Sequence, residues 1–190
     1  VMLKSGAPWN RVPPVIADST VGWRFVNPRM APAWTISLGM TAEKVAAQYG
    51  ITRGEQDAFA FESQQRAARA LRDGVFRDEI VPVEIPGKKG GLVAVTEDEH
   101  PRPDVSLEGL AALKPAFTAH GTVTAGNASG INDGSSALLI VSDAGAGSVR
   151  PLARIVVSAV AGVDPSVMGL GPVPAVRKAL GRAGLTVDQI

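Results

Sequence analysis

The sequence contains no cysteine among its 190 residues. This absence excludes disulfide bonds, a thiolate metal site and a cysteine nucleophile within the chain. Histidine is scarce as well, since His100 and His120 are the only two. The formal net charge is only +1, and the basic residues do not cluster, so we expect neither a nucleic-acid partner nor a bound metal.

Long hydrophobic runs are also missing. No run approaches the roughly 20 apolar residues that a membrane-spanning helix needs, so no membrane partner is expected. The first ten residues lack the apolar centre of a secretion signal. These absences make the cytoplasm the expected compartment.

The most informative stretch that is present covers residues 121–142, GTVTAGNASGINDGSSALLIVS. Its first half carries Gly126, Gly130 and Gly134 among Asn, Asp and Ser, which are typical turn residues. Its second half, residues 135–141, ends in the apolar run Ala137–Val141 and predicts a strand buried on both faces of a sheet. The pattern indicates a glycine-lined loop that leads into a central strand, and such loops often contact ligands.

Glycines at this spacing more often form turns than a binding site. The stretch matches neither the dinucleotide-binding G-x-G-x-x-G motif nor the phosphate-binding G-x-x-x-x-G-K-[ST] motif. The residue pattern by itself therefore leaves a structural turn and a binding loop both open.

The remaining chain predicts alternating helices and strands. Residues 1–32 show no period, and their prolines favour turns and extended backbone. Capping residues and apolar periodicity then predict a helix capped by Thr41 and stopped at Gly50, a helix from Thr52 to about Asp73, strands at 79–85 and 92–96, a short helix capped by Ser106, a strand at 151–160, and a helix from Pro172 to Gly184.

Several segments of the chain resemble the thiolases, a family of acyl-CoA acyltransferases. The resemblance is carried by T-V-T-A-G-N-A-S-G-I-N-D-G, R-G-E-Q-D-A-F-A-F-E-S-Q-Q-R-A, L-K-P-A-F and V-M-G-L-G-P-V-P-A-V-R-K-A-L, in the correct order. It implies an α/β fold of two similar halves, with a loop domain inserted in the first. The chain would supply that loop domain at residues 1–120, the last strand region of the first half at 121–150, and the start of the second half at 151–190.

The resemblance implies cleavage or formation of a 3-oxoacyl-CoA through a cysteine acyl-enzyme. Two cysteines and the histidine of a G-H-P motif carry that chemistry in the family, and the chain contains none of them. We therefore assign no catalytic residue and interpret His100 and His120 as surface histidines. The chain alone should be inactive, and a non-catalytic CoA-binding or acyl-binding module, or an assembly piece, is the alternative.

Coenzyme A binding is what the resemblance places on this chain. CoA and acyl-CoA would be substrates, with no permanently bound cofactor. Arg102 would meet the adenine-phosphate end, where a surface arginine is the alternative, and Met168 would lie at the thioester end, where a core residue is the alternative. The other expected contacts are Ser37, Leu38, Phe117, Ala125 and Ser129, of which Ser37-Leu38 replaces a His-Met pair common in the family.

One segment narrows the subfamily. T-V-G-W-R-F-V-N-P-R-M resembles enzymes that cleave 3-oxoadipyl-CoA in the degradation of aromatic acids. Such a substrate has a distal carboxylate, for which Arg24 is the candidate partner, followed by Arg29. A surface arginine near an oligomer contact is the alternative for Arg24. The family resemblance also implies a homodimer or a homotetramer.

Overall fold

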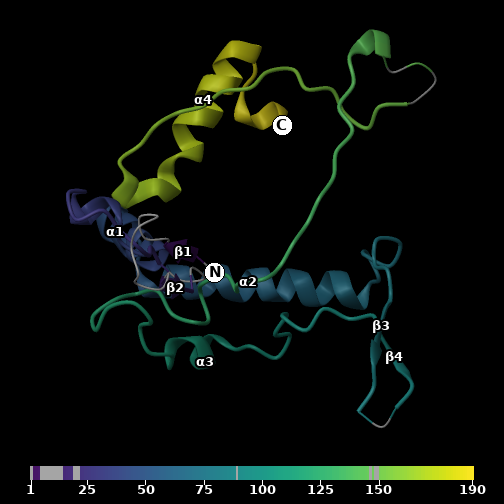
Figure 1. Ribbon diagram of the computed structural model, residues 1–190, viewed down its shortest axis with the longest axis horizontal. Coiled ribbons are helices and arrows are strands. Elements are labelled where there is room, and N and C mark those ends of the chain that lie inside the picture. Colours follow the sequence, from purple (N-terminus) through teal and green to yellow (C-terminus); the bar gives the residue numbers. More distant parts are fainter. Residues whose placement is uncertain (1, 5–14, 19–21, 89, 146, 148–149) are drawn as a thin grey trace, which may run out of the picture. The chain divides into compact units, whose positions relative to one another are not determined.

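The computed structural model describes residues 2–4, 15–18, 22–88, 90–145, 147 and 150–190. They divide into two compact units, which are taken in turn below. One unit is Ala46–Gly130, and the other combines Val1–Val45 with Ile131–Ile190. Figure 1 labels the helices and strands.

Helix α1 (Leu38–Tyr49) begins earlier than the sequence predicted. The Ser37 side chain accepts a hydrogen bond from the Met40 amide at 3.4 Å, whereas the Thr41 hydroxyl donates to the Leu38 carbonyl at 2.6 Å. The prediction that Thr41 caps this helix was therefore wrong. The predicted stop is confirmed, because Gly50 has a φ of +65°, which favours glycine.

Helix α2 (Arg53–Arg72) is the longest element and has the predicted capping box. The Thr52 hydroxyl accepts from the Glu55 amide, and the Glu55 carboxylate accepts from the Thr52 amide at 2.7 Å. These bonds from Thr52 hold the pKa of Glu55 below its ordinary value. The helix ends at Asp73, followed by Gly74 with a φ of +68°.

The predicted hairpin is present as β3 (Val83–Pro86) paired antiparallel with β4 (Leu92–Val95). Its first strand begins later than predicted because residues 76–80 form turns, with the Glu79 and Ile80 amides donating to the Phe76 carbonyl. All residues of both strands are exposed. Nothing in the described part of this unit therefore covers either face of the hairpin.

Helix α3 (Leu107–Ala111) is capped as predicted by Ser106, whose hydroxyl accepts from the Gly109 amide at 3.0 Å. It packs against α2, and an isolated bridge joins Pro115 to Thr124 nearby. The buried apolar side chains described in this unit are few, namely Ala46, Leu110 and Val123. Its core is small, so polar contacts must contribute to holding the loops in place.

The other unit contains short elements and one amphipathic helix. Strands β1 (Met2–Lys4) and β2 (Val15–Ala17) pair antiparallel, which the sequence did not predict. The predicted helix is confirmed as α4 (Pro172–Ala183), which ends at Gly184 with a φ of +67°. The 3₁₀ turns are η1 (Pro32–Trp34), η2 (Asp143–Gly145), η3 (Pro165–Leu170) and η4 (Val187–Gln189).

The two predicted central strands are not formed. Residues 135–141 and 151–160 have no strand partner among the described residues. Figure 1 draws both segments as plain chain without a strand arrow. Leu138 and Leu139 are each 87% exposed, and Val160 is 82% exposed. A strand exists only when a neighbour shares its backbone hydrogen bonds, so apolar sequence without a partner strand gives none.

Candidate functional site

The glycine-lined loop at residues 122–130 is held by the side-chain amide of Asn127. Its oxygen accepts from the Thr124 amide at 2.7 Å. Its nitrogen donates to the Thr122 carbonyl at 3.0 Å and to the Asp57 carboxylate at 3.0 Å. One planar group thus fixes the backbone of the loop and joins it to helix α2.

Asp57 is the buried charge beneath this loop, with only 4% of its surface exposed. Its second oxygen accepts from Nε of Arg53 at 2.7 Å. The same guanidinium donates to the carbonyls of Leu110 at 2.5 Å and Leu113 at 3.1 Å, at the end of α3. The carboxylate is therefore neutralised by a cation that is itself bonded to two backbone carbonyls through Nη2, as a buried ion pair favours.

Two further contacts complete the support of the loop. Gln56 donates from its side chain to the Thr122 hydroxyl at 3.0 Å. Thr124 has no exposed surface, and its hydroxyl accepts from the Gly126 amide at 3.2 Å. Among the described side chains, no buried polar atom lacks a partner. The loop is thus rigidly built, which suits a binding surface.

Gly126 lets this loop approach helix α3 closely. A β-carbon there would lie 2.5 Å from a methyl group of Leu110 and 2.6 Å from one of Leu113. Glycine is required here for space, because its φ is not in the left-handed region. On the outer side of the loop, Ala125 and Ser129 are exposed, so a ligand could reach both.

The segment 97–103 lies beside this loop. The Arg102 amide donates to the Gln64 side chain at 2.8 Å, which attaches the segment to α2. The Arg102 guanidinium donates to the carbonyls of Glu99 at 2.9 Å and His100 at 3.2 Å. This exposed guanidinium is bonded to carbonyls of its own segment and pairs with no carboxylate among the described residues.

The eight residues predicted to bind substrate are divided between the two units. Arg102, Phe117, Ala125 and Ser129 belong to Ala46–Gly130, where all four are exposed. The structure brings Ala125 and Ser129 together on one loop. The other unit contains Arg24, Ser37, Leu38 and Met168.

In that other unit, Met168 lies in the turn η3, which is anchored from α1. Lys44 donates to the Ser166 hydroxyl at 2.8 Å, and the Ser166 amide donates to the Asp164 carboxylate at 2.8 Å. The bonds from Ser166, with a smaller effect of the Lys44 charge, hold the pKa of Asp164 below its ordinary value. Met168 itself is 48% exposed, so in this chain it is not a core residue.

The remaining predictions are less organised. Ser37 caps α1 through its hydroxyl, and Leu38 is 66% exposed. Arg24 is exposed and donates to the neighbouring Trp23 carbonyl at 3.1 Å. Arg29 donates its backbone amide to the Asn27 side chain. These bonds do not place either arginine in a carboxylate-binding site.

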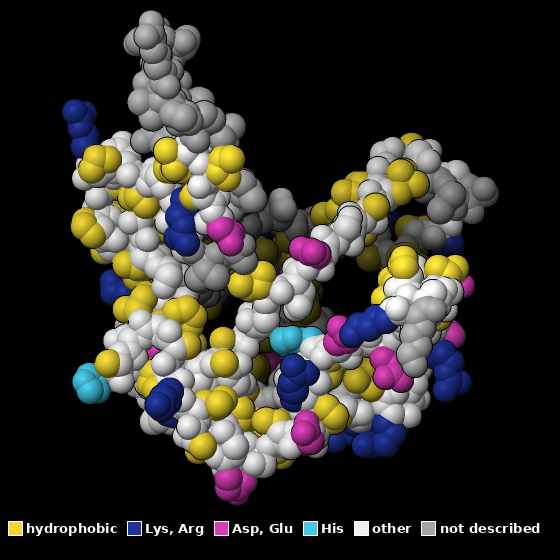
Figure 2. Space-filling model, turned by 60° about the horizontal axis from the view of Figure 1, so that its bottom comes forward, with side chains coloured by type: hydrophobic (Ala, Val, Ile, Leu, Met, Phe, Trp, Pro, Cys, Tyr) yellow, Lys and Arg dark blue, Asp and Glu magenta, His cyan; other side chains and the backbone are white. Residues whose placement is uncertain are grey.

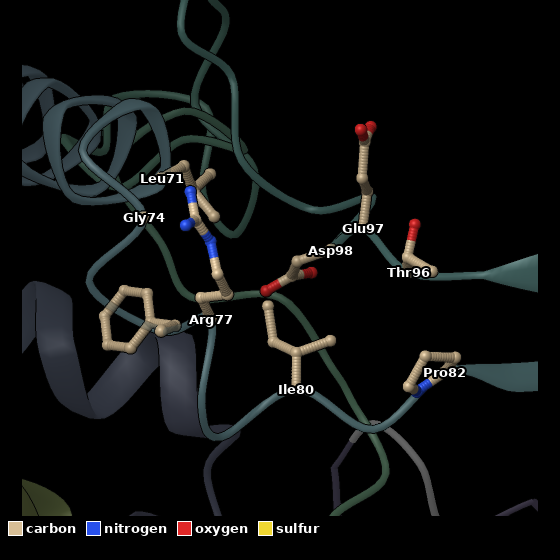
Figure 3. A pocket seen from close by; sticks show the side chains of 9 residues that line it. Leu71, Gly74, Arg77, Ile80, Pro82, Thr96, Glu97 and Asp98 are labelled. Atoms are coloured by element: carbon tan, nitrogen blue, oxygen red, sulfur yellow. The ribbon is translucent and has the colours of Figure 1, made fainter.

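A separate pocket lies at the base of the β3–β4 hairpin (Figure 3). Its volume is about 520 Å³, and Asp98, one of its lining residues, also accepts from the His100 amide at 3.2 Å. In Figure 3 the Glu97 side chain points away from the others. The lining residues are Leu71, Gly74, Phe76, Arg77, Ile80, Pro82, Thr96, Glu97 and Asp98, none of which the sequence predicted as a ligand contact.

Two further searches of the described residues gave negative results. They contain no cluster of His, Asp and Glu that could hold a metal ion. None of their helices is both long enough and apolar enough to cross a membrane.

Sequence reasoning missed Arg53, Asp57 and Asn127. One signal was available in the sequence. Arg53 and Asp57 stand at i, i+4 at the start of a helix, beside the polar residue Gln56. The sequence did not show that this pair is buried, because burial depends on the loop that folds over it.

This loop, helix α2 and the turn at Met168 all lie in parts of the chain that match known protein families. The family described as Thiolase, N-terminal domain, matches residues 27–144, and Thiolase, C-terminal domain, matches residues 149–190. The chain therefore belongs to the thiolase family, as its motifs predicted, and the expected α/β thiolase-like fragment is confirmed.

Named relatives agree with this assignment. The chain is 52% identical over 176 residues to "3-oxoadipyl-CoA/3-oxo-5,6-dehydrosuberyl-CoA thiolase" of Escherichia coli K12, covering 91% of this chain and 44% of that protein. It is 56% identical over 169 residues to "Acetyl-CoA acetyltransferase" of Chromobacterium violaceum, covering 87% and 43%. The chain thus spans less than half the length of the curated relatives it matches.

Solved structures give the same result. The crystal structure of Bacillus anthracis acetyl-CoA acetyltransferase matches with a TM-score of 0.75 and 48% identity, over 83% of this chain and 40% of that one. Human mitochondrial 3-ketoacyl-CoA thiolase matches with a TM-score of 0.74 and 46% identity, over 82% and 39%.

Proposed function

We propose that this chain is the CoA-binding part of a thiolase that cleaves or forms a 3-oxoacyl-CoA. The observation that carries the proposal is the match of two consecutive thiolase domains across the chain. In the complete protein, a cysteine supplied outside this chain would hold the acyl group, because the chain itself has none. The cytoplasmic location and the homodimeric or homotetrameric state belong to the same proposal.

The CoA surface would be built from the loop at 122–130 and the segment at 97–103. Exposed Ala125 and Ser129 offer an apolar and a hydroxyl contact to the pantetheine chain. Arg102 would swing from its own carbonyls to a phosphate, which a guanidinium binds more strongly than a neutral acceptor. Phe117 would line the same channel. Ser37, Leu38 and Met168 are the CoA contacts that we propose for the other unit.

The substrate class we favour is 3-oxoadipyl-CoA. Several relatives at about half identity are named for this substrate, including that of Escherichia coli K12. In this proposal Arg24 binds the distal carboxylate. The test is Arg24→Ala in the complete protein, assayed with 3-oxoadipyl-CoA and with acetoacetyl-CoA.

Loss of the carboxylate partner should lower kcat/KM for 3-oxoadipyl-CoA. The activation free energy should rise by about 1.5–3 kcal/mol, the usual contribution of a hydrogen bond to a charged group. Acetoacetyl-CoA lacks the distal carboxylate and should be cleaved as before. Equal losses on both substrates would leave Arg24 a structural residue.

A non-catalytic CoA-binding or assembly module is the second candidate. Because this chain has no cysteine, the complete protein would be such a module if its first half had none either. A complete protein that binds CoA, as measured by calorimetry, but does not cleave acetoacetyl-CoA would support this alternative.

A further inference from the structure

Asp57 is a carboxylate that the chain has buried under the proposed CoA loop. Placing an ionised carboxylate at 4% exposure is unfavourable unless each oxygen has a partner. One oxygen is bonded to Arg53 at 2.7 Å, and the other to Asn127 at 3.0 Å. Two segments far apart in the sequence are therefore joined through this one group.

Asn127 transmits the position of Asp57 to the loop backbone. The amide is planar, so once Asp57 fixes one of its N–H groups, the direction of its other N–H and of its oxygen is fixed too. These atoms bind the Thr122 carbonyl at 3.0 Å and the Thr124 amide at 2.7 Å. The exposed residue Ala125 follows Thr124 directly, and the exposed residue Ser129 lies two positions after Asn127.

Arg53 ties the other side of the unit to helix α3. Its guanidinium makes three bonds at once, to Asp57 and to the carbonyls of Leu110 and Leu113. A planar fork can satisfy all three acceptors, whereas a lysine ammonium on a flexible stem cannot reproduce that geometry. Arginine is therefore the cation best suited to join helix α2 to the end of α3.

The same helix contains a matched pair without this role. Glu62 and Arg66 also stand at i, i+4 and are also 2.7 Å apart. Their side chains are 52% and 72% exposed, and no bond joins that pair to another described segment. An exposed pair of this kind contributes little, so it separates the effect of charge on α2 from the effect of position.

We propose that Arg53, Asp57 and Asn127 are positioning residues that set the affinity of the loop at 122–130 for the pantetheine part of CoA. None of them touches CoA. The inference rests on the proposed function, because it assumes that this loop contacts CoA. It adds the residues through which helix α2 controls the loop.

The test compares Asp57→Asn with Glu62→Gln in the complete protein. CoA binding is measured by calorimetry, and amide hydrogen exchange is followed at Thr124 and Gly126. Asp57→Asn should weaken CoA binding about 10-fold or more, since it removes a buried charged partner. It should also speed exchange in the loop and raise KM for CoA while leaving kcat at saturating CoA within a factor of about two. Glu62→Gln should change none of these quantities.

Arg53→Lys provides a milder second variant if Asp57→Asn does not fold. It keeps the charge beside Asp57 and loses the fork, so an intermediate loss of CoA affinity is expected. Unchanged CoA affinity in a folded Asp57 or Arg53 variant overturns the inference, whatever the exchange rates are. A wild-type protein that binds no CoA overturns the proposed function instead, and the exchange measurement then still decides whether the three residues hold the loop.

Discussion

The imidazole of His100 lies against the backbone of Gly130, at a place where a β-carbon would overlap the ring. The φ of Gly130 is not positive, so the glycine is needed for space and not for its conformation. This contact brings the segment that carries Arg102 onto the loop that carries Ser129. His100, which the sequence suggested was an ordinary surface histidine, therefore packs between two parts of the proposed CoA surface.

Gly130→Ala should displace His100 with little loss of stability. Both residues are exposed, so the ring can move aside, and we expect a change of less than about 0.5 kcal/mol in the free energy of unfolding. The imidazole NMR signals should shift, and CoA binding should weaken. Gly134→Ala is the control, because its β-carbon would meet nothing within 4 Å. Unshifted His100 signals would contradict the packing described here.

Gly126→Ala should be much more destabilising than Gly130→Ala. The methyl group would press on Leu110, which is only 2% exposed and has no free space to enter. Overpacking of this kind costs about 1–3 kcal/mol, which chemical denaturation would measure. Gly54→Ala in helix α2, where nothing lies within 4 Å, should preserve or raise stability. Equal stabilities of the Gly126→Ala and Gly54→Ala variants would show that the loop is not tightly packed on α3.

Local signals in the sequence predicted where the helices lie, although the predicted cap of α1 at Thr41 was wrong. The capping box of Thr52 and Glu55, the Ser106 cap and the glycines that end α2 and α4 need only neighbouring residues, so their pattern determined the structure. The strands at 135–141 and 151–160 failed because pairing is a property of two segments, and the described chain offers them no neighbour. The short strands β1 and β2 were missed because they lack any periodic pattern.

The candidate site divides in the same way. Family motifs indicated the exposed residues Ala125 and Ser129, whose roles still await a test. They did not indicate Asp57, because a helical aspartate is usually exposed and only the folded loop covers it. The His100 contact with Gly130 was equally beyond the sequence, since it joins residues on two separate loops.

Helix α2 should lose part of its capping in acid. The folded-state pKa of Glu55 lies below its ordinary value of 4.5, so its contribution is present above that value and is lost as the pH falls through the lowered pKa. Glu55→Ala should therefore destabilise the protein at neutral pH, and the difference from wild type should shrink in strong acid. Urea denaturation at several pH values measures this. A difference that stays constant with pH would mean that the carboxylate does not act as a cap.

The 190-residue chain alone should self-associate through its two exposed apolar segments, residues 135–141 and 151–160. Leu139 in the first is 87% exposed and Val156 in the second is 70% exposed, and neither segment has a strand partner among the described residues. Figure 2 also shows hydrophobic side chains spread over the visible surface. Exposed apolar side chains on segments without a strand partner favour pairing with another chain.

Lysine substitutions separate strand pairing from general hydrophobicity. Leu139→Lys and Val156→Lys should each reduce association in sedimentation velocity experiments, because charge on an edge strand opposes pairing. Phe59→Lys removes a side chain that is 81% exposed, on helix α2, where backbone groups are already bonded within the helix. It should leave association unchanged. If Phe59→Lys dissociates the oligomers as well as Leu139→Lys does, association depends on exposed apolar area, and strand pairing by these two segments does not contribute to it.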